Sequence, residues 1–267
     1  MVEIDWANLD GAYADRASSI TIGVFDGVHL GHRALIDRVV ASDGMPVVVT
    51  FQRHPTELLL HDDIPGFIMS LRQKRAILTN LGIEVAVLID FTESFQSMSG
   101  LTFLETLEAS FQLRRIVVGH DFRCGYRLDT DVRTITQRYA GRDVEVIAVD
   151  PVVAGPQPVS SSRIRGLILR GELEEAAQLL GRPYALDTAD ETIERDGGWL
   201  YIVKDDRGLF PESRQLLPPP GSYRATIGSA QGEHDAELTI GVNSVSWPLV
   251  APGTIRYIVV HQRRISE

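Results

Sequence analysis

Apolar residues gather in short runs through the first 150 residues of the chain, and these runs alternate with segments in which apolar residues recur every three or four positions. Runs that are apolar on nearly every residue are typical of strands covered on both faces. They are Ile20–Phe25, Pro46–Phe51, Val85–Asp90, Arg115–Gly119 and Val144–Val149. The helical spacing predicts four amphipathic helices between and beyond them, at His32–Ala41, Leu71–Leu81, Leu101–Phe111 and Asp131–Tyr139. This alternation predicts an α/β fold with a doubly wound parallel sheet.

The pattern changes towards the end of the chain. A helical stripe of Leu173, Ala176, Ala177 and Leu180 lies between two glycines, and Pro183 prevents its continuation. Beyond it, short apolar runs are separated by Gly and Pro turn signals. These runs are Trp199–Lys204, Tyr223–Ile227, Ala236–Ile240, Val245–Leu249 and Ile255–His261. We therefore expect a first domain of residues 1–184 and a small all-β domain of residues 185–267.

Composition limits the kind of protein this is. Of 267 residues, 44% are hydrophobic and 23% charged, which is ordinary for folded globular domains. The net charge of −10 argues against nucleic-acid binding, which needs a basic surface. The single cysteine, Cys124, allows no internal disulfide and fits a reducing compartment. The chain begins without a leader-like segment, and its longest apolar runs are strand-sized, so we expect a cytoplasmic protein without a membrane span. Protein partners are not predicted.

The most informative segment is Gly23–His32, which leads from the first predicted strand into the first predicted helix. Three glycines let the backbone approach a ligand closely, and the helix start offers unpaired N–H groups, so the segment is suited to binding phosphate. His29 and His32 are three residues apart, which would turn both imidazoles to one side of a helix that starts near His29. The alternatives are a glycine-rich turn with two surface histidines, or a zinc pair, for which no third ligand is evident nearby.

Two further candidates follow predicted strands, at the edge of a parallel sheet where ligands bind. Asp121 follows the fourth strand, although it could simply cap a turn. His54 and Pro55 follow the second strand, although this histidine could be an ordinary loop residue stiffened by the proline. We expect Asp121 to face a ligand, whereas the residues alone leave both interpretations of His54 open.

A run of hydroxyl and guanidinium groups marks another helix start. Ser160–Ser162 could serve only as a helix cap, and we expect a capping role. With Arg163 and Arg165 beside them, the same residues could also bind a polyphosphate. Lys74 and Arg75, in contrast, are interpreted as part of a solvated helix face.

The segment Gly-x-Phe-Asp-Gly-Val-His-x-Gly-His at 23–32 resembles the His-x-Gly-His signature of the nucleotidyltransferase superfamily. In its longer form it is similar to the FAD synthetase (FMN adenylyltransferase) module of bacterial bifunctional riboflavin kinase/FAD synthetases. Three other motifs of that module have counterparts here, followed by a matching Leu-Gly-Arg-Pro-Tyr at 180–184. They are Thr-Phe-x-x-His-Pro at 50–55, Val-Val-Gly-x-Asp-Phe-Arg at 117–123 and the serine and arginine run at 159–165. The resemblance covers residues 20–184.

The resemblance implies a Rossmann-like sheet of the nucleotidyltransferase type and an enzyme that transfers the adenylyl group of ATP, carried with Mg²⁺, to FMN, giving FAD and pyrophosphate. The implied catalytic residues are His29, His32 and Arg165. The implied ATP-binding residues are Gly23, Phe25, Asp26, Gly31, Ser160, Ser161 and Ser162, and the implied flavin-binding residues are Phe51, His54, Pro55 and Asp121. No residue is assigned as a metal ligand.

The sequence departs from the family in two places. Riboflavin kinase modules carry a Gly-x-Pro-Thr-Ala-Asn motif, and residues 185–267 contain no Pro-Thr pair. We therefore expect a degenerate riboflavin-kinase-like barrel without kinase activity. Cys124 stands where the synthetase pattern usually has an aromatic residue. Two alternatives remain: a nucleotidyltransferase acting on another phosphorylated acceptor, and a non-catalytic regulator that binds flavin or nucleotide.

Overall fold

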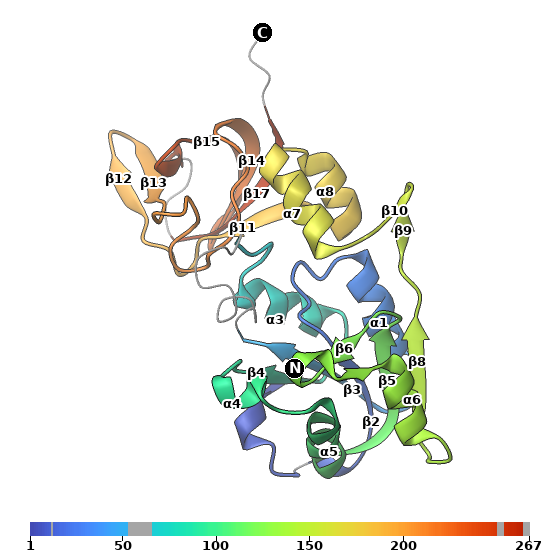
Figure 1. Cartoon of the computed structure of the whole chain (residues 1–267). Coiled ribbons are helices and arrows are strands. Elements are labelled where there is room, and N and C mark those ends of the chain that lie inside the picture. The colour runs from blue at the N-terminus through green and yellow to red at the C-terminus, as the bar shows by residue number, and fades with distance from the viewer. Residues whose placement is uncertain (12, 53–65, 250–253, 264–267) are drawn as a thin grey trace. The chain divides into compact units, whose positions relative to one another are not determined.

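The computed structural model describes residues 1–11, 13–52, 66–249 and 254–263, and its chain divides into two compact units (Figure 1). The first unit comprises residues 1–25, 31–64 and 75–153, and the second comprises residues 26–30, 65–74 and 154–267. The two helices within residues 161–180, which the sequence analysis assigned to the first domain, group with the second unit. The domain boundary at residue 184 stays a prediction.

A six-stranded parallel sheet forms the centre of the first unit, in the order β1-β4-β3-β2-β5-β8. Its strands are β1 (Val2–Asp5), β2 (Tyr13–Ile22), β3 (Met45–Phe51), β4 (Val85–Ile89), β5 (Phe111–Gly119) and β8 (Glu145–Val149). All five predicted strands are present, which confirms the parallel α/β architecture. The edge strand β1 was not predicted, because its four residues alternate between apolar and acidic side chains.

Strand β2 lies at the point where the order of the strands reverses, because β3 and β4 lie on one side of it and β5 and β8 on the other. Connections between parallel strands are right-handed as a rule, and with this strand order they place helices on both faces of the sheet. Residues of α5 and α6 join the strand residues in one continuous buried cluster on one face. The helices of this unit and its connections are α1 (Leu30–Val40), α3 (Leu71–Asn80), α4 (Glu93–Gln96), α5 (Gly100–Ser110) and α6 (Val132–Tyr139).

Side-chain caps fix where several of these helices begin. Ser99 Oγ accepts a hydrogen bond from the Thr102 N–H before α5, and an Asp131 oxygen accepts one from the Thr134 N–H before α6. Asp131 is therefore the N-cap of α6, whereas the sequence pattern had counted it as the first residue of that helix. Short elements complete this part of the chain: β6 (Arg123–Cys124), β7 (Thr130–Asp131), η1 (Trp6–Asn8) and η2 (Tyr126–Leu128).

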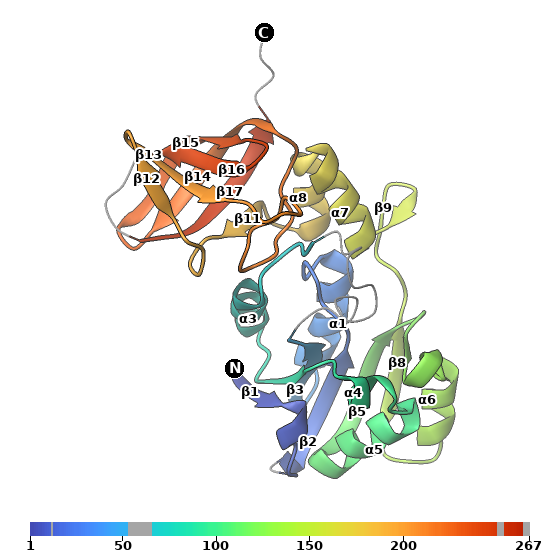
Figure 2. The ribbon, with the colours of Figure 1, turned by 60° about the vertical axis from the view of Figure 1, so that its left-hand side comes forward.

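The second unit contains two helices and a seven-stranded antiparallel sheet in the order β11-β17-β14-β15-β16-β13-β12 (Figure 2). Its helices are α7 (Ser161–Arg170) and α8 (Leu173–Leu180), with the small hairpin β9 (Val153–Ala154) and β10 (Gln157–Pro158) before them. The strands are β11 (Tyr184–Asp187), β12 (Glu194–Asp196), β13 (Trp199–Val203), β14 (Gly221–Ser229), β15 (Gly232–Ile240), β16 (Ser244–Pro248) and β17 (Ile255–Arg263). The all-β character of this region is confirmed. Because β11 and β12 each pair with one neighbour in the described ladders, a riboflavin-kinase-like barrel stays a prediction.

A fully buried glutamine explains why residues 66–74 belong to the second unit. The Gln215 side chain accepts a hydrogen bond from the Asp187 N–H (2.6 Å) and donates to the carbonyls of Ala185 (3.1 Å) and Ile68 (3.2 Å). Asp187, also buried, pairs with Arg72. The segment before α3 is thereby tied to β11. Within the described residues, no helix combines the length and apolar content needed to cross a membrane.

Candidate active site

The turn from β2 into α1 has a strained backbone. Phe25 and Val28 adopt positive φ angles of 53° and 36°, and Gly27 between them has a φ of 84°. A left-handed conformation is unusual for any residue with a side chain and most unfavourable for a β-branched one, and each such residue costs on the order of 1–3 kcal/mol. Phe25 and Val28 are both fully buried. Contacts from elsewhere in the protein must therefore hold this turn in place.

Asp26 provides several of these contacts within the second unit. Its side chain is 5% exposed, and the carboxylate accepts hydrogen bonds from Arg165 Nη2 (2.9 Å) and from the Ile68 N–H (3.1 Å). Its backbone carbonyl accepts one from Ser161 Oγ (2.8 Å). The structure thus brings together three predicted site residues, Asp26, Ser161 and Arg165. Because Asp26 is occupied by these partners, it acts in the protein as a fixed anion that orients the Arg165 guanidinium.

Two basic side chains that the sequence analysis did not assign to the site also contact this turn or face it. Arg182 donates to the carbonyls of Gly27 (2.6 Å) and Val28 (3.1 Å). Lys74 is only 8% exposed, and burial lowers its pKa to about 8, with the Asp26 charge acting in the opposite direction. The prediction of a solvated face is therefore wrong for Lys74, because the segment that precedes α3 packs into the second unit. Arg75 is partly exposed and pairs with Glu3 (2.8 Å).

The two histidines differ in their surroundings. His29 is the residue immediately before α1 and is 5% exposed. Burial, and then the charges of Arg182 and Arg165, lower its pKa to about 4, so the imidazole is neutral at pH 7 and has one ring N–H group to donate. His32 lies in the first turn of α1 after Gly31, with its ring centroid 5.0 Å from that of Phe25. These residues lie at the helix start, where backbone N–H groups have no partner within the helix.

A cavity of about 790 Å³ opens in the first unit at the carboxyl ends of β2, β3 and β4 and beyond β5. Ligands bind at this edge of open parallel sheets, and the volume is typical of small-molecule sites. Phe51 and Gly23 both lie in the lining, and their roles in binding flavin and ATP stay predictions. Most of the lining is apolar or aromatic. Its members are Ile22, Gly23, Val24, Phe51, Ile89, Phe91, Phe95, Gln96, Met98, Phe103, Phe122, Arg123, Cys124, Gly125, Tyr126, Arg127 and Leu128.

The aromatic lining was largely missed by sequence reasoning, although a signal for it existed. Phe91 follows the end of β4 by two residues, and Phe122 follows the end of β5 by three. Residues at these positions lie at the ligand-binding edge by the same rule that singled out Asp121. Cys124 also lines the cavity, and burial, together with the Asp129 charge, raises the pKa of its thiol to about 12. The thiol is therefore protonated at pH 7 and is not a nucleophile there.

Other predicted residues have different positions. Ser160 caps α7 by accepting a hydrogen bond from the Arg163 N–H, which confirms the capping role, and Ser162 is exposed in the first turn of that helix. Asp121 has a side chain that is 84% exposed and does not line the cavity, so its flavin role stays a prediction. His54 and Pro55 lie outside the described residues.

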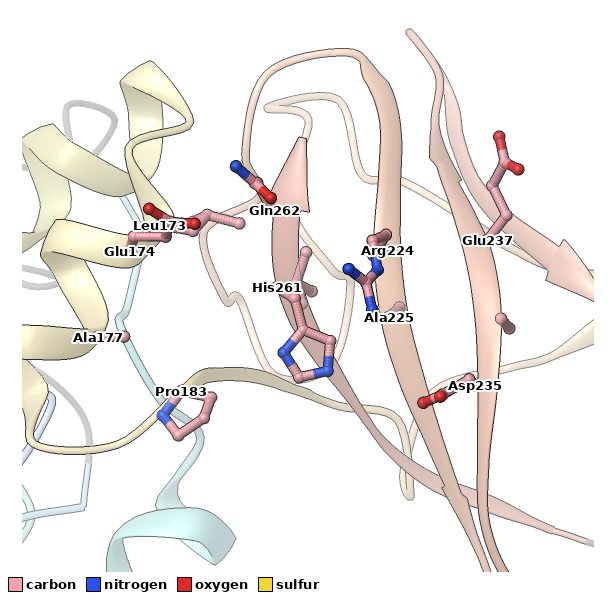
Figure 3. Close-up of a pocket in the computed structure, with 12 residues that line it drawn as sticks. Leu173, Glu174, Ala177, Pro183, Arg224, Ala225, Asp235, Glu237, His261 and Gln262 are labelled. Carbon is pink, nitrogen blue, oxygen red and sulfur yellow. The ribbon is translucent and has the colours of Figure 1, made fainter. Parts of the chain in front are cut away.

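A second cavity, of about 620 Å³, lies in the second unit between α8 and strands β14, β15 and β17 (Figure 3). Glu174 extends from the helix, and Arg224 and His261 extend from the strands. None of the predicted site residues lines this cavity. The candidate functional residues therefore form two groups, which are the strained turn with its basic partners and the aromatic cavity of the first unit.

A protein-family model described as FAD synthetase matches residues 12–163, which is more than half of the chain. The chain belongs to the FAD synthetase family. As a member of this family it is an enzyme, a nucleotidyltransferase. The family assignment from the His-x-Gly-His segment is thereby confirmed.

Two relatives from Listeria monocytogenes show how far this similarity extends. A bifunctional riboflavin kinase/FMN adenylyltransferase is 32% identical over 237 residues, which cover 86% of this chain and 74% of the relative. A protein named FAD synthetase is 26% identical over 246 residues, which cover 91% of this chain and 94% of the relative. Each of these matches therefore covers much more of this chain than the region that the family model matches.

A solved structure shares the fold along the whole chain. It is described as a macrolide-efflux protein from Streptococcus pneumoniae, and the comparison gives a TM-score of 0.82 at 22% identity, covering 100% of this chain and 91% of the other. At this level of identity the likeness concerns the fold alone. It supports the combination of a parallel sheet with a separate antiparallel sheet in one polypeptide.

Proposed function

We propose that this enzyme transfers the adenylyl group of ATP to FMN, producing FAD and pyrophosphate. The observation that carries the proposal is the aromatic cavity at the sheet edge, whose volume and lining suit a flat, largely apolar ring system. Val24 lines the cavity, and His29 lies five residues after Val24 in the sequence. The flavin would occupy the cavity, and its phosphate would react with the α-phosphate of ATP.

The chemistry requires stabilisation of negative charge more than a general base. The second pKa of a phosphomonoester is about 6, so the attacking FMN phosphate is largely ionised at pH 7. One of its oxygens forms a bond to the α-phosphorus of ATP while the bond to the β-phosphate breaks and pyrophosphate leaves. His29 and His32 would donate hydrogen bonds to the α-phosphate and the bridging oxygen. Preorganised donors of this kind stabilise the transition state without reorganising.

The β- and γ-phosphates would be held by the start of α7. Ser161, Ser162 and Arg165 supply hydroxyls, helix N–H groups and a guanidinium there, and Asp26 fixes that guanidinium. Mg²⁺, when bound, would neutralise charge on the phosphates. Within the described part of the chain no group of three or more His, Cys, Asp or Glu could hold a metal ion. Mg²⁺ often binds mainly through substrate phosphates, so this residue set is compatible with an ion that arrives with ATP.

We further propose that the enzyme lacks riboflavin kinase activity. The relative named FAD synthetase is covered almost to its full length, whereas about a quarter of the bifunctional relative lies outside the match. Residues 185–267 also contain no Pro-Thr pair, which the kinase motif requires. The second unit would then serve the transferase by holding the turn at residues 26–30.

The decisive assay supplies ATP and Mg²⁺ with either FMN or riboflavin and follows FAD, FMN and pyrophosphate. We expect FAD and pyrophosphate in equal amounts from FMN, and no FMN from riboflavin. Other phosphorylated acceptors are tested in parallel, because Cys124 lines the cavity at a position where the family resemblance implies an aromatic residue. Formation of FMN from riboflavin would contradict the proposal that the enzyme lacks kinase activity. Preference for another phosphorylated acceptor would contradict FMN as the substrate. Nucleotide binding without turnover would indicate a non-catalytic regulator.

The cavity is tested by Phe122→Leu, which removes an aromatic ring but keeps apolar volume. An aromatic contact contributes about 0.5–1.5 kcal/mol beyond buried area, so we expect the KM for FMN to rise about 2- to 12-fold. The KM of this variant for ATP should stay within about twofold of the wild-type KM, because a change of about twofold is the smallest that such an assay resolves. The matched control is Phe111→Leu, a buried ring of the same unit outside the cavity. An unchanged KM for FMN in Phe122→Leu, or an equal rise in the control, would remove the flavin from this cavity.

A further inference from the structure

The segment Leu-Gly-Arg-Pro-Tyr at 180–184 has no role in the function proposed so far, yet its arginine contacts the strained turn. Arg182 Nη2 donates to the Gly27 carbonyl (2.6 Å), and Nη1 donates to the Val28 carbonyl (3.1 Å). These two carbonyls belong to the peptide units directly before His29. A planar guanidinium can serve both oxygens at once, which a lysine ammonium cannot do with the same geometry.

The backbone of Arg182 is itself held firmly. Helix α8 ends at Gly181, whose φ of 70° is left-handed, and the N–H groups of Gly181 and Arg182 both donate to the Ala177 carbonyl. Pro183 restricts the next residue, and the buried Tyr184 donates its hydroxyl hydrogen to the Leu216 carbonyl (2.6 Å). The backbone that carries the guanidinium is therefore rigid, which suits a group that holds a strained turn.

We propose that Arg182 is a positioning residue for adenylyl transfer, which holds the Gly27–Val28 turn and thereby fixes the His29 imidazole against the reacting phosphate. Val28 adopts a left-handed φ that a β-branched residue rarely takes, and such a conformation persists only where its surroundings impose it. The Arg182 hydrogen bonds impose it at the two carbonyls that flank the strained residue. This inference rests on the proposed adenylyl transfer for its kinetic readout.

Arg182 also affects the charge state of His29. Burial lowers the pKa of His29 most, and the charges of Arg182 and Arg165 lower it further. Asp26 pairs with Arg165 (2.9 Å), and its charge also acts on Lys74. Removing the Arg182 charge should raise the pKa of His29 from about 4 towards the ordinary value of 6.5. A lysine at position 182 keeps the charge and loses the two-carbonyl geometry. The two substitutions therefore separate charge from geometry.

The experiment compares Arg182→Met, Arg182→Lys and the control Arg170→Met, an exposed arginine of the same unit that pairs with Glu172. Misplacing a catalytic group by about 1 Å can lower turnover about 10²-fold, so we expect kcat for FAD formation to fall about 10- to 100-fold in both Arg182 variants. The KM values should change much less. The pKa of His29, followed by NMR of the free labelled protein, should rise in Arg182→Met, stay near the wild-type value in Arg182→Lys, and be unaffected in Arg170→Met.

Wild-type kcat in folded Arg182→Lys, or an unchanged His29 pKa in folded Arg182→Met, would overturn the proposal. If Arg182→Met does not fold, Arg182→Lys carries the test, because a fall in kcat with an unchanged His29 pKa is the result expected of lost geometry. The NMR measurement needs neither ATP nor FMN. A wild-type enzyme that makes no FAD would therefore defeat the proposed reaction, while the titration would still report whether Arg182 acts on His29.

Discussion

Replacing His29 with alanine lowers kcat for FAD formation by about 10²–10³-fold, which is the usual effect of removing one preorganised hydrogen-bond donor. The buried imidazole is neutral at pH 7, because burial and two arginines lower its pKa to about 4. It donates a hydrogen bond without releasing a proton in the pH range in which the FMN phosphate is ionised. The same loss is expected for His32→Ala, in the first turn of α1.

The measurement is steady-state kinetics at saturating ATP and FMN, with kcat and both KM values determined. Loss of an interaction made mainly in the transition state lowers kcat and leaves KM close to the wild-type value. The matched control is His261→Ala, on strand β17 of the antiparallel sheet. Turnover that stays near the wild-type rate in both variants would remove the histidines from the reaction, and an equal loss in the control would indicate general damage.

Replacing Asp26 with alanine is expected to lower the free energy of unfolding by about 3–5 kcal/mol, the effect of removing one partner from a buried ion pair. The Asp26 and Arg165 side chains are 5% and 15% exposed, so solvent cannot replace the lost carboxylate. The buried Ile68 N–H would also lose its acceptor. Lys74 would lose the anion that counteracts the effect of burial on its pKa, which would fall further below about 8.

Urea unfolding at pH 7 measures this loss. The matched control is Glu172→Ala, which breaks the Arg170–Glu172 pair at a site where both side chains are about half exposed. Exposed pairs contribute about 0–1 kcal/mol, so the control should stay close to the wild type. Equal losses in the two variants would mean that Asp26 has no special structural role. Adenylyl transfer by Asp26→Ala, measured where it is fully folded, should also fall, because Arg165 loses the group that orients it.

How much the sequence could predict depended on whether a feature was local. The strands β3 and β4 are continuous apolar runs because the sheet is covered on both faces, and such runs are visible without any tertiary information. The alternating β1 lies at the sheet edge beside β4, and β11 carries no pattern that separates it from a loop. Pairing with a strand far away in sequence makes each of them a strand.

The site shows the same division. The segment Gly23–His32 could be singled out because its glycines and histidines are close together in sequence, and Ser160 was expected to cap α7 because capping is local. The exposure of Lys74 was predicted wrongly, since its position on α3 gave no sign that its side chain is buried within the second unit. Arg182 is 154 residues from Val28, and no spacing rule links residues so far apart.

The left-handed turn before α1 also constrains when this enzyme can become active during its synthesis. The ribosome releases the first four strands of the parallel sheet long before it releases Arg165 and Arg182, which stabilise residues 26–28. A nascent chain that ends before α8 can complete its parallel sheet while its histidine segment remains free to relax to ordinary backbone angles. Competence for catalysis therefore arises late in translation, when the last of these side chains has emerged.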